Sequence, residues 1–258
     1  MKFDSFIPTD ILKPYIRILV ISESEMAQEY KILPGTEVVI GFQYKGKLSY
    51  HDGDKYIPLA SSGLTGLMDQ YRIFNHAGGI GSVLVFFKEG AAASFFRHPI
   101  HELFRESISL DNFILRSELL ILEEKLQESK TDPEKIDIVE QFLISIMRPV
   151  LPDQLVVSAI SMIYKSKGNI RMKELLIGLH VSQSVLEKRF RQLVGASPKK
   201  FASIVRFKHA IQTYDRSKSL TDLSYEAGFY DQAHFIKEIR NFTGESPESF
   251  FRKPDQPD

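Results

Sequence analysis

The chain has 258 residues, of which 43% are hydrophobic and 26% charged, the balance of a globular protein with room for two domains. This composition excludes a disordered chain and a coiled-coil rod, and the absence of cysteine excludes disulfides, thiolate nucleophiles and cysteine-ligated metals. The formal net charge of zero hides a division, because residues 1–150 carry 16 basic and 21 acidic side chains, a net of −5, whereas residues 151–258 carry 17 and 12, a net of +5. A basic C-terminal portion suits a polyanionic partner.

Short apolar runs alternate with glycine-containing turns in the first third of the chain. The runs span 16–21, 37–44, 48–51, 56–59, 73–75 and 82–87. The segments 45–47 and 52–54, Lys-Gly-Lys and Asp-Gly-Asp, predict hairpin turns, because glycine adopts the positive φ of a tight reversal without strain. We therefore expect an antiparallel β barrel or sandwich.

Helical patterns replace the strands after residue 90. The expected helices span 91–97, 112–128 and 133–147. Asp111 or Asn112 would cap the second helix, and Pro133 would open the third. The third carries an apolar stripe that is either internal packing or the seam of a dimer: Ile136, Val139, Phe142, Leu143 and Ile146.

A linker divides the chain. The segment from Arg148 to Asp153 contains two prolines, which discourage a continuous helix. We therefore expect one domain over 1–148 and a second, all-helical domain over 149–258.

The second domain contains an internal repeat. A shift of 48 residues aligns the earlier helices of the two copies, and a shift of 49 residues aligns the rest, so one turn is a residue longer in one copy than in the other. That shift of 49 gives nine matched positions within sixteen residues: Leu186 with Phe235, Lys188 with Lys237, Phe190 with Ile239, Arg191 with Arg240, Leu193 with Phe242, Gly195 with Gly244, Ser197 with Ser246, Pro198 with Pro247 and Phe201 with Phe250. The chain therefore holds two copies of one helical unit.

The first copy has the pattern of helix, tight turn, helix. A helix over 171–178 is followed by a turn, and Ser182 is the expected cap of a helix over 183–194. Periodicity turns one face of this helix inward, with Leu186, Phe190, Leu193 and Val194. The opposite face carries Ser184, Glu187, Lys188 and Arg191.

The second copy repeats the pattern. Thr221 would cap a helix that runs to Ala227, the chain would reverse at 228–230, and a second helix would begin at Asp231. This helix would bury Phe235, Ile239 and Phe242 and present Gln232, Ala233, His234, Lys237 and Asn241. Two short helices with a polar, basic face on the second describe a helix-turn-helix unit, whose second helix fits the major groove of DNA.

A long helix from Pro198 to about Tyr214 is expected between the two units. At 1.5 Å per residue it spans roughly 25 Å. With the widths of the flanking helices added, the two second helices could lie roughly 34 Å apart, one turn of B-DNA. One chain could then read two successive major grooves on one face of the duplex.

These motifs carry a family resemblance. Residues 181–198, VSQSVLEKRFRQLVGASP, with 227–235, AGFYDQAHF, and 242–247, FTGESP, resemble the DNA-binding domain of AraC-type transcriptional regulators over about residues 153–253. The resemblance implies base-edge contacts from Ser184, Glu187, Lys188, Gln232, Ala233, His234 and Lys237. For phosphate contacts we expect Gln183, Arg191, Lys199, Lys200 and Arg240. Lys199 and Lys200 lie at a helix N-terminus, whose free N–H groups attract phosphate.

The N-terminal part has a less specific resemblance. Residues 85–104 and 108–113 are similar to the N-terminal domains of an AraC-type subgroup, which have a cupin-like β fold used for effector sensing or dimerisation. The expected fold class is therefore α+β, with an N-terminal β-rich, cupin-like barrel, a helical extension, and a C-terminal all-α domain holding two helix-turn-helix units.

Histidine and aromatic side chains give no sharper prediction. His98 and His101 supply two ligands where a transition-metal site needs three or more, so no metal is expected there. His51 and His76 are expected to be bystanders at strand ends. The strand aromatics are either the lining of an effector pocket or, as strand propensity favours, mostly core: Phe42, Tyr44, Tyr50, Tyr71, Phe74, Phe86 and Phe87.

The predicted function is a sequence-specific DNA-binding transcriptional regulator that responds to an effector and is not an enzyme. The candidate partners are double-stranded DNA, a small-molecule effector, RNA polymerase and a second copy of the chain; no cofactor, metal or membrane partner is expected. No apolar run or signal pattern points to a membrane or to secretion, so we expect a cytoplasmic protein. The alternatives are a cupin-type metal-dependent enzyme with a helical interaction tail, and an N-terminal half that only dimerises.

Overall fold

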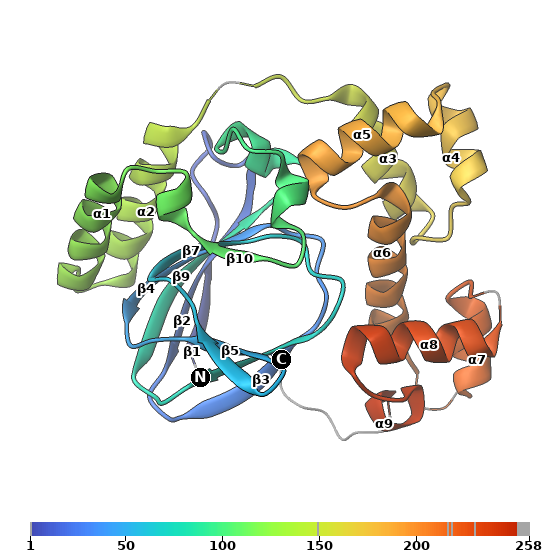
Figure 1. The fold of residues 1–258 in the computed structure, drawn as a ribbon, viewed down its shortest axis with the longest axis horizontal. Helices are drawn as coiled ribbons and strands as arrows, with labels where there is room; N and C mark the ends of the chain where they lie inside the picture. The colour runs from blue at the N-terminus through green and yellow to red at the C-terminus, as the bar shows by residue number, and fades with distance from the viewer. Residues whose placement is uncertain (1, 149, 216, 218, 230, 252–258) are drawn as a thin grey trace.

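The computed structural model describes residues 2–148, 150–215, 217, 219–229 and 231–251. A β-rich N-terminal region lies beside a helical C-terminal region, and a chain segment around residue 150 passes from one to the other (Figure 1). The predicted fold class, β-rich then all-helical, is confirmed.

The strands form two antiparallel sheets. The six-stranded sheet has the order β1 (Lys2–Phe6), β2 (Ile16–Ser24), β9 (Ile80–Phe87), β4 (Val39–Lys45), β7 (Ser62–Thr65) and β10 (Ser107–Ser109). The four-stranded sheet has the order β3 (Gln28–Ile32), β8 (Arg72–His76), β5 (Ser49–Asp52) and β6 (Lys55–Pro58). The apolar runs of the sequence lie in these strands. The sequence did not predict β1, β3, β7 or β10, because these short polar strands are held by pairing with a neighbour and not by an apolar pattern of their own.

The two predicted hairpin turns differ. Gly53, with φ of 60°, joins β5 to β6, in which Asp52 pairs with Lys55, so this hairpin is confirmed. Gly46, with φ of 68°, joins β4 to β5, which belong to different sheets. The hairpin prediction at 45–47 is therefore wrong, because β4 already pairs with β7 and β9 at its two edges.

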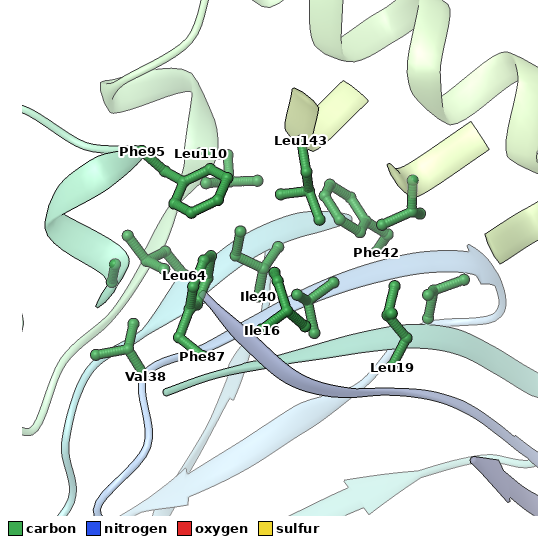
Figure 2. Packing of buried hydrophobic residues seen from close by; sticks show 14 of the residues in the cluster. Ile16, Leu19, Val38, Ile40, Phe42, Leu64, Phe87, Phe95, Leu110 and Leu143 are labelled. Carbon is green, nitrogen blue, oxygen red and sulfur yellow. The ribbon is translucent and has the colours of Figure 1, made fainter. Parts of the chain in front are cut away.

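Two helices, α1 (Arg116–Glu128) and α2 (Asp132–Ile146), pack against the six-stranded sheet. Figure 2 shows Leu143 of α2 close to Phe42 of β4, within a core that also takes Ile16, Ile40 and Phe87. Ile136, Val139 and Leu143 of the predicted stripe are buried, and Phe142 and Ile146 pack against the same core. The stripe is internal packing, and the alternative of a dimer seam is wrong for it.

Two helices expected between β9 and α2 differ from prediction in length or in starting residue. The helix expected over 91–97 is only the 3₁₀ turn η1 (Ala91–Ser94), because the next two residues, Phe95 and Phe96, turn into the core. The further 3₁₀ turn η2 (Ile100–Leu103) follows. The predicted cap of α1 is wrong, because Asp111 and Asn112 lie in the 3₁₀ turn η3 (Leu110–Asn112).

The start of α2 is closer to prediction. Pro133 stands in its first turn, as expected. The cap is Thr131, whose side chain accepts from the N–H of Glu134, while the carboxylate of Glu134 accepts from the N–H of Thr131.

The C-terminal helices are α3 (Gln154–Lys165), α4 (Met172–Leu179), α5 (Gln183–Val194), α6 (Pro198–Gln212), α7 (Leu220–Glu226), α8 (Gln232–Thr243) and α9 (Pro247–Phe251). They share one hydrophobic core, and α6 runs through its centre with Phe201, Ile204 and Phe207 buried. None of the helices in the part of the chain that the structure describes is long and apolar enough to cross a membrane.

Candidate nucleic-acid interface

The first helix-turn-helix unit is formed by α4 and α5. His180 ends α4 with a left-handed φ of 50°, and Ser182 is the N-cap residue of α5, as predicted. The side chain of Ser182 makes no capping bond and instead lies 3.3 Å from the hydroxyl of Ser184. On the inner side of α5, Leu186, Phe190 and Val194 are buried.

The second unit is formed by α7 and α8. Its first cap is Ser219 and not Thr221, because the hydroxyl of Ser219 accepts from the N–H of Asp222 at 3.1 Å in a capping box. The predicted reversal at 228–230 includes Gly228, with φ of 74°, and Tyr230, which lies outside the described residues. Asp231 caps α8 by accepting from the N–H of His234 at 2.7 Å.

The long helix α6 fixes one unit relative to the other. The ring of Phe201 in its first turn packs 5.4 Å from that of Phe190 on α5. Two residues past the middle of α6, the ring of Phe207 packs 4.7 Å from that of Phe242 on α8. Both second helices are therefore packed on one 15-residue helix, which spans about 22 Å.

The side chains expected to read bases lie on the outer surface of α5 and α8. Exposed members of this set are Ser184, Lys188, Gln232, Ala233, His234 and Lys237. Glu187 is half-buried, and its carboxylate accepts from the Gln183 amide at 2.9 Å. Neither lysine is tucked into the protein, so both are available to a ligand from outside.

Cations of the helical domain fall into two groups. Arg189, Arg206 and Lys208 are paired with Asp153, Glu238 and Glu37 at 2.7, 2.8 and 3.3 Å. By contrast, five exposed cations form no ion pair with any residue in the described ranges: Lys188, Arg191, Lys199, Lys237 and Arg240. All five are residues that the sequence assigns to the DNA side, on the outer faces of α5 and α8 and at the start of α6. Exposed cations near α3 and α4, Lys165 and Lys173 among them, also form no ion pair within the described ranges, so it is the matched placement on α5 and α8 that distinguishes these. A surface that leaves cations without carboxylates suits a polyanion.

Lys200 differs from this group. Its ammonium lies 2.8 Å from the carboxylate of Asp69, a fully buried residue of the N-terminal region that also pairs with Arg105. Burial by itself raises the pKa of Asp69, but the hydrogen bonds and charges of Arg105 and Lys200 outweigh it and hold that pKa below its ordinary value. The stabilisation from this pairing is present above about pH 4 and is lost as the pH falls through the lowered pKa.

A second polar contact joins α3 to the N-terminal region. The hydroxyl of Tyr164 donates to the carboxylate of Glu89, which also accepts from Arg17 at 2.6 Å. Burial raises the pKa of Glu89, whereas Tyr164 and Arg17 lower it by more, so the net shift is downward. Burial and the same carboxylate raise the pKa of Tyr164.

Comparisons with known proteins agree with this geometry. Residues 177–253 match the model of a family described as a helix-turn-helix domain. The Msm operon regulatory protein of Streptococcus mutans is 31% identical over 84 residues, which make up 32% of this chain and 30% of that protein. The C-terminal region is an AraC-type helix-turn-helix domain.

Other matches concern the rest of the chain. Residues 4–109 match a domain of unknown function, DUF6597. Among solved structures, ToxT from Vibrio cholerae, bound to (E)-4-(8-methylnaphthalen-1-yl)but-3-enoic acid, is 12% identical, with a TM-score of 0.45 over 90% of this chain and 96% of that one. The AraC-like transcriptional activator CuxR is 12% identical, with a TM-score of 0.31 over 88% and 91%. The curated relative is matched over less than a third of its own length.

The remaining histidine candidates belong to the N-terminal region. The ring of His98 packs 4.9 Å from that of Phe113, and His101 is exposed. His76 is buried, which lowers its pKa, and His51 packs against Tyr56. No cluster of three or more His, Asp or Glu side chains suited to a metal occurs among the residues that the structure describes.

The strand aromatics divide by position. Phe42 and Phe87 are in the core, as expected, and Tyr44 packs against it. The ring of Tyr30, which the sequence did not single out, stacks 5.8 Å from that of Phe74. Tyr71 instead contacts the AraC-type domain, at Gly244.

Sequence reasoning missed how the two regions are joined. Asp69 and Arg105 contact or support the AraC-type domain, yet their neighbours in the chain show no repeat, periodicity or motif. Tyr71 was named only as a pocket or core aromatic, and its contact with Gly244 was not predicted. The only signal available was an isolated acid at Asp69 between apolar and polar residues, a pattern that is common on protein surfaces.

Proposed function

We propose that this protein is a sequence-specific DNA-binding transcriptional regulator whose two helix-turn-helix units read two successive major grooves on one face of the duplex. One observation carries the proposal: unpaired lysine and arginine side chains occupy equivalent outer positions of α5 and α8, and both helices are packed on α6. Such an arrangement suits the regular spacing of DNA grooves.

The proposal gives the outer side chains separate roles. Base edges would be read in the first unit by Ser184, Glu187 and Lys188, and in the second by Gln232, Ala233, His234 and Lys237. Phosphates would be contacted by Gln183, Arg191, Lys199 and Arg240. Lys200, the other residue expected there, is instead held by Asp69. Phosphate contacts supply salt-sensitive affinity, whereas base contacts supply the choice of sequence.

The N-terminal region is assigned the regulatory role. Its contacts with α5, α6 and α8 support this assignment, because a ligand bound there has a direct physical route to the DNA-reading helices. A small-molecule effector, a second copy of the chain, RNA polymerase and a cytoplasmic location belong to the same proposal. A shift in melting temperature across a panel of metabolites, followed by DNA binding with each hit, tests the effector.

The test of the main proposal begins with selection of bound sequences from a random oligonucleotide pool. Gel-shift titrations on the selected duplex and on random DNA are then repeated at rising salt. We expect affinity for both to fall with salt, and Lys237→Ala to reduce the preference for the selected duplex by about 1–3 kcal/mol. Equal weakening on both DNAs would make Lys237 a phosphate contact only, and the absence of salt-sensitive binding would reject the function.

A further inference from the structure

Two segments of the N-terminal region hold the C-terminal ends of the two DNA-reading helices. In Figure 1 these ends of α5 and α8 face the β-rich region, while α4 and α7 lie on the far side. The ends that carry the proposed base contacts therefore point away from the N-terminal region. A support at the opposite ends leaves the reading surface open.

The first segment, Leu67–Tyr71, follows β7 and contacts α6 and α8. Leu67 is fully buried in the core of the helical domain. The backbone carbonyl of Asp69 accepts from the side-chain amide of Asn241 on α8 at 3.1 Å, and the side-chain amide of Gln70 donates to Oδ1 of Asn241 at 3.1 Å.

The same segment closely approaches Gly244, the C-cap residue that follows α8. A Cβ on Gly244 would lie 2.6 Å from the ring of Tyr71, so the contact depends on glycine at that position. Lys31 of β3 adds a charge at this end, because its ammonium donates to the carbonyl of Thr243 at 2.8 Å.

The second segment, Ile100–Arg105, precedes β10 and contacts α5. Ile100 is fully buried, and a Cβ on Gly195, which ends α5, would lie 3.1 Å from its side chain. Phe104 packs against the core of the helical domain. This segment therefore holds the first unit as Leu67–Tyr71 holds the second.

An ion pair ties the two segments together. The guanidinium of Arg105 is bidentate on the carboxylate of Asp69, with Nη2 3.0 Å from Oδ2, and the Arg105 N–H donates to the carbonyl of Leu67 at 3.0 Å. Arg105 adopts φ of 65°, a left-handed conformation that is unfavourable for a side chain of this size and is maintained here by the pair. The remaining side of the Asp69 carboxylate takes Lys200, at the start of α6.

We infer that Asp69 is a positioning residue for DNA reading: through Arg105, Lys200 and Asn241 it fixes the separation of α5 and α8 from the side opposite to the DNA. The inference rests on the proposed function. Without Asp69 the units remain joined by α6 but lose the second support, so the protein tolerates DNA sites of different spacing.

The experiment compares spacing preference in full-length wild type and Asp69→Asn. The probes are the selected duplex, the same duplex with one base pair inserted or removed between its two half-sites, and a duplex with one half-site. One base pair moves a half-site by about 3.4 Å along the axis. We expect wild type to bind the altered spacings about tenfold more weakly, Asp69→Asn to bind all three spacings within about threefold, and both to bind the single half-site alike.

Controls separate positioning from general damage. Asp10→Asn breaks an exposed ion pair with Lys13, 2.6 Å long and far from the helical domain in sequence, and should keep the wild-type spacing ratio. If Asp69→Asn does not fold, as judged by circular dichroism and melting, Arg105→Gln removes the same ion pair from the other side. The spacing comparison is then made with Arg105→Gln.

Different results would overturn the inference about Asp69 and the proposed function. A folded Asp69→Asn or Arg105→Gln protein that retains the tenfold spacing preference overturns the inference alone. A uniform loss of affinity on every duplex, single half-site included, also overturns it, because Asp69 would then be merely structural. Failure of wild type to bind the selected duplex rejects the proposed function.

Discussion

In the first helix-turn-helix unit Leu186 and Phe190 face the core, and in the second Phe235 and Ile239 occupy the same positions 49 residues later. The outer positions do not repeat in this way: Ser184 corresponds to Ala233, Val185 to His234, and Glu187 to Ile236, whereas Gln183, Lys188 and Arg191 correspond to Gln232, Lys237 and Arg240. The repeated outer residues include the arginine proposed for phosphate and the lysine proposed for bases. The divergent ones predict that the two units read different sequences, so the two half-sites are not a direct repeat.

Truncating the shared buried positions should have the largest effect. Phe190→Ala and Ile239→Ala each leave a cavity in a fully buried site, so we expect losses of about 3–5 and about 2–5 kcal/mol in the free energy of unfolding. Denaturant titration followed by circular dichroism measures both. If only one variant lost less than about 1 kcal/mol of unfolding free energy, the buried positions of the two units would not be equivalent.

Removing the repeated lysine should act on one half-site at a time. Lys188→Ala should relax sequence choice in one half of the selected DNA and Lys237→Ala in the other half, each by about 1–3 kcal/mol. Repeating the random-pool selection with each variant gives the result. If both variants relax the same base pairs, the two units do not read separate grooves.

The turns of the two units hold different residues at positive φ, so substitutions there should change protein stability in opposite directions. Gly228 has φ of 74°, and a Cβ there would lie 2.3 Å from the side chain of Asn169, so Gly228→Ala should destabilise the protein by about 1–2 kcal/mol. His180 holds the corresponding turn at φ of 50° at a conformational cost, so His180→Gly should be stabilising by up to about 1 kcal/mol. Melting of both variants checks the signs, and stabilisation by Gly228→Ala would contradict them.

Two adjacent lysines should respond unequally. Lys199 is exposed and forms no ion pair within the described ranges, whereas Lys200 is held by Asp69. Lys199→Gln should reduce the slope of log affinity against log salt by about 0.9, and Lys200→Gln should leave it nearly unchanged. Equal slopes would mean that DNA releases Lys200 from Asp69.

Much of the helical domain was predictable because its signals are local and occur twice. Ser182 and Asp231 mark helix starts, Gly195 and Gly244 mark helix ends, and the spacing of Leu186 and Phe190 defines a buried face. Thr221 was mistaken for a cap because Ser219 and Asp222 form a box two residues earlier. The outer face followed from the same periodicity, although the role of each side chain on it is a prediction.

The N-terminal region was predictable only in class. Its pairing is non-local, so the six-stranded order and the passage between sheets at Gly46 depend on partners far along the chain. The tie between Asp69 and Arg105 spans 36 residues and joins side chains that no sequence pattern relates. A contact of that kind is set by the tertiary fold of the N-terminal region and not by any local pattern.

The central claim is that one chain places two reading helices in successive major grooves on the same face of DNA. Hydroxyl-radical footprinting of wild type on its selected duplex tests it most directly. We expect two protected patches on one face, about ten base pairs apart. A single patch, or two patches on opposite faces, would contradict it.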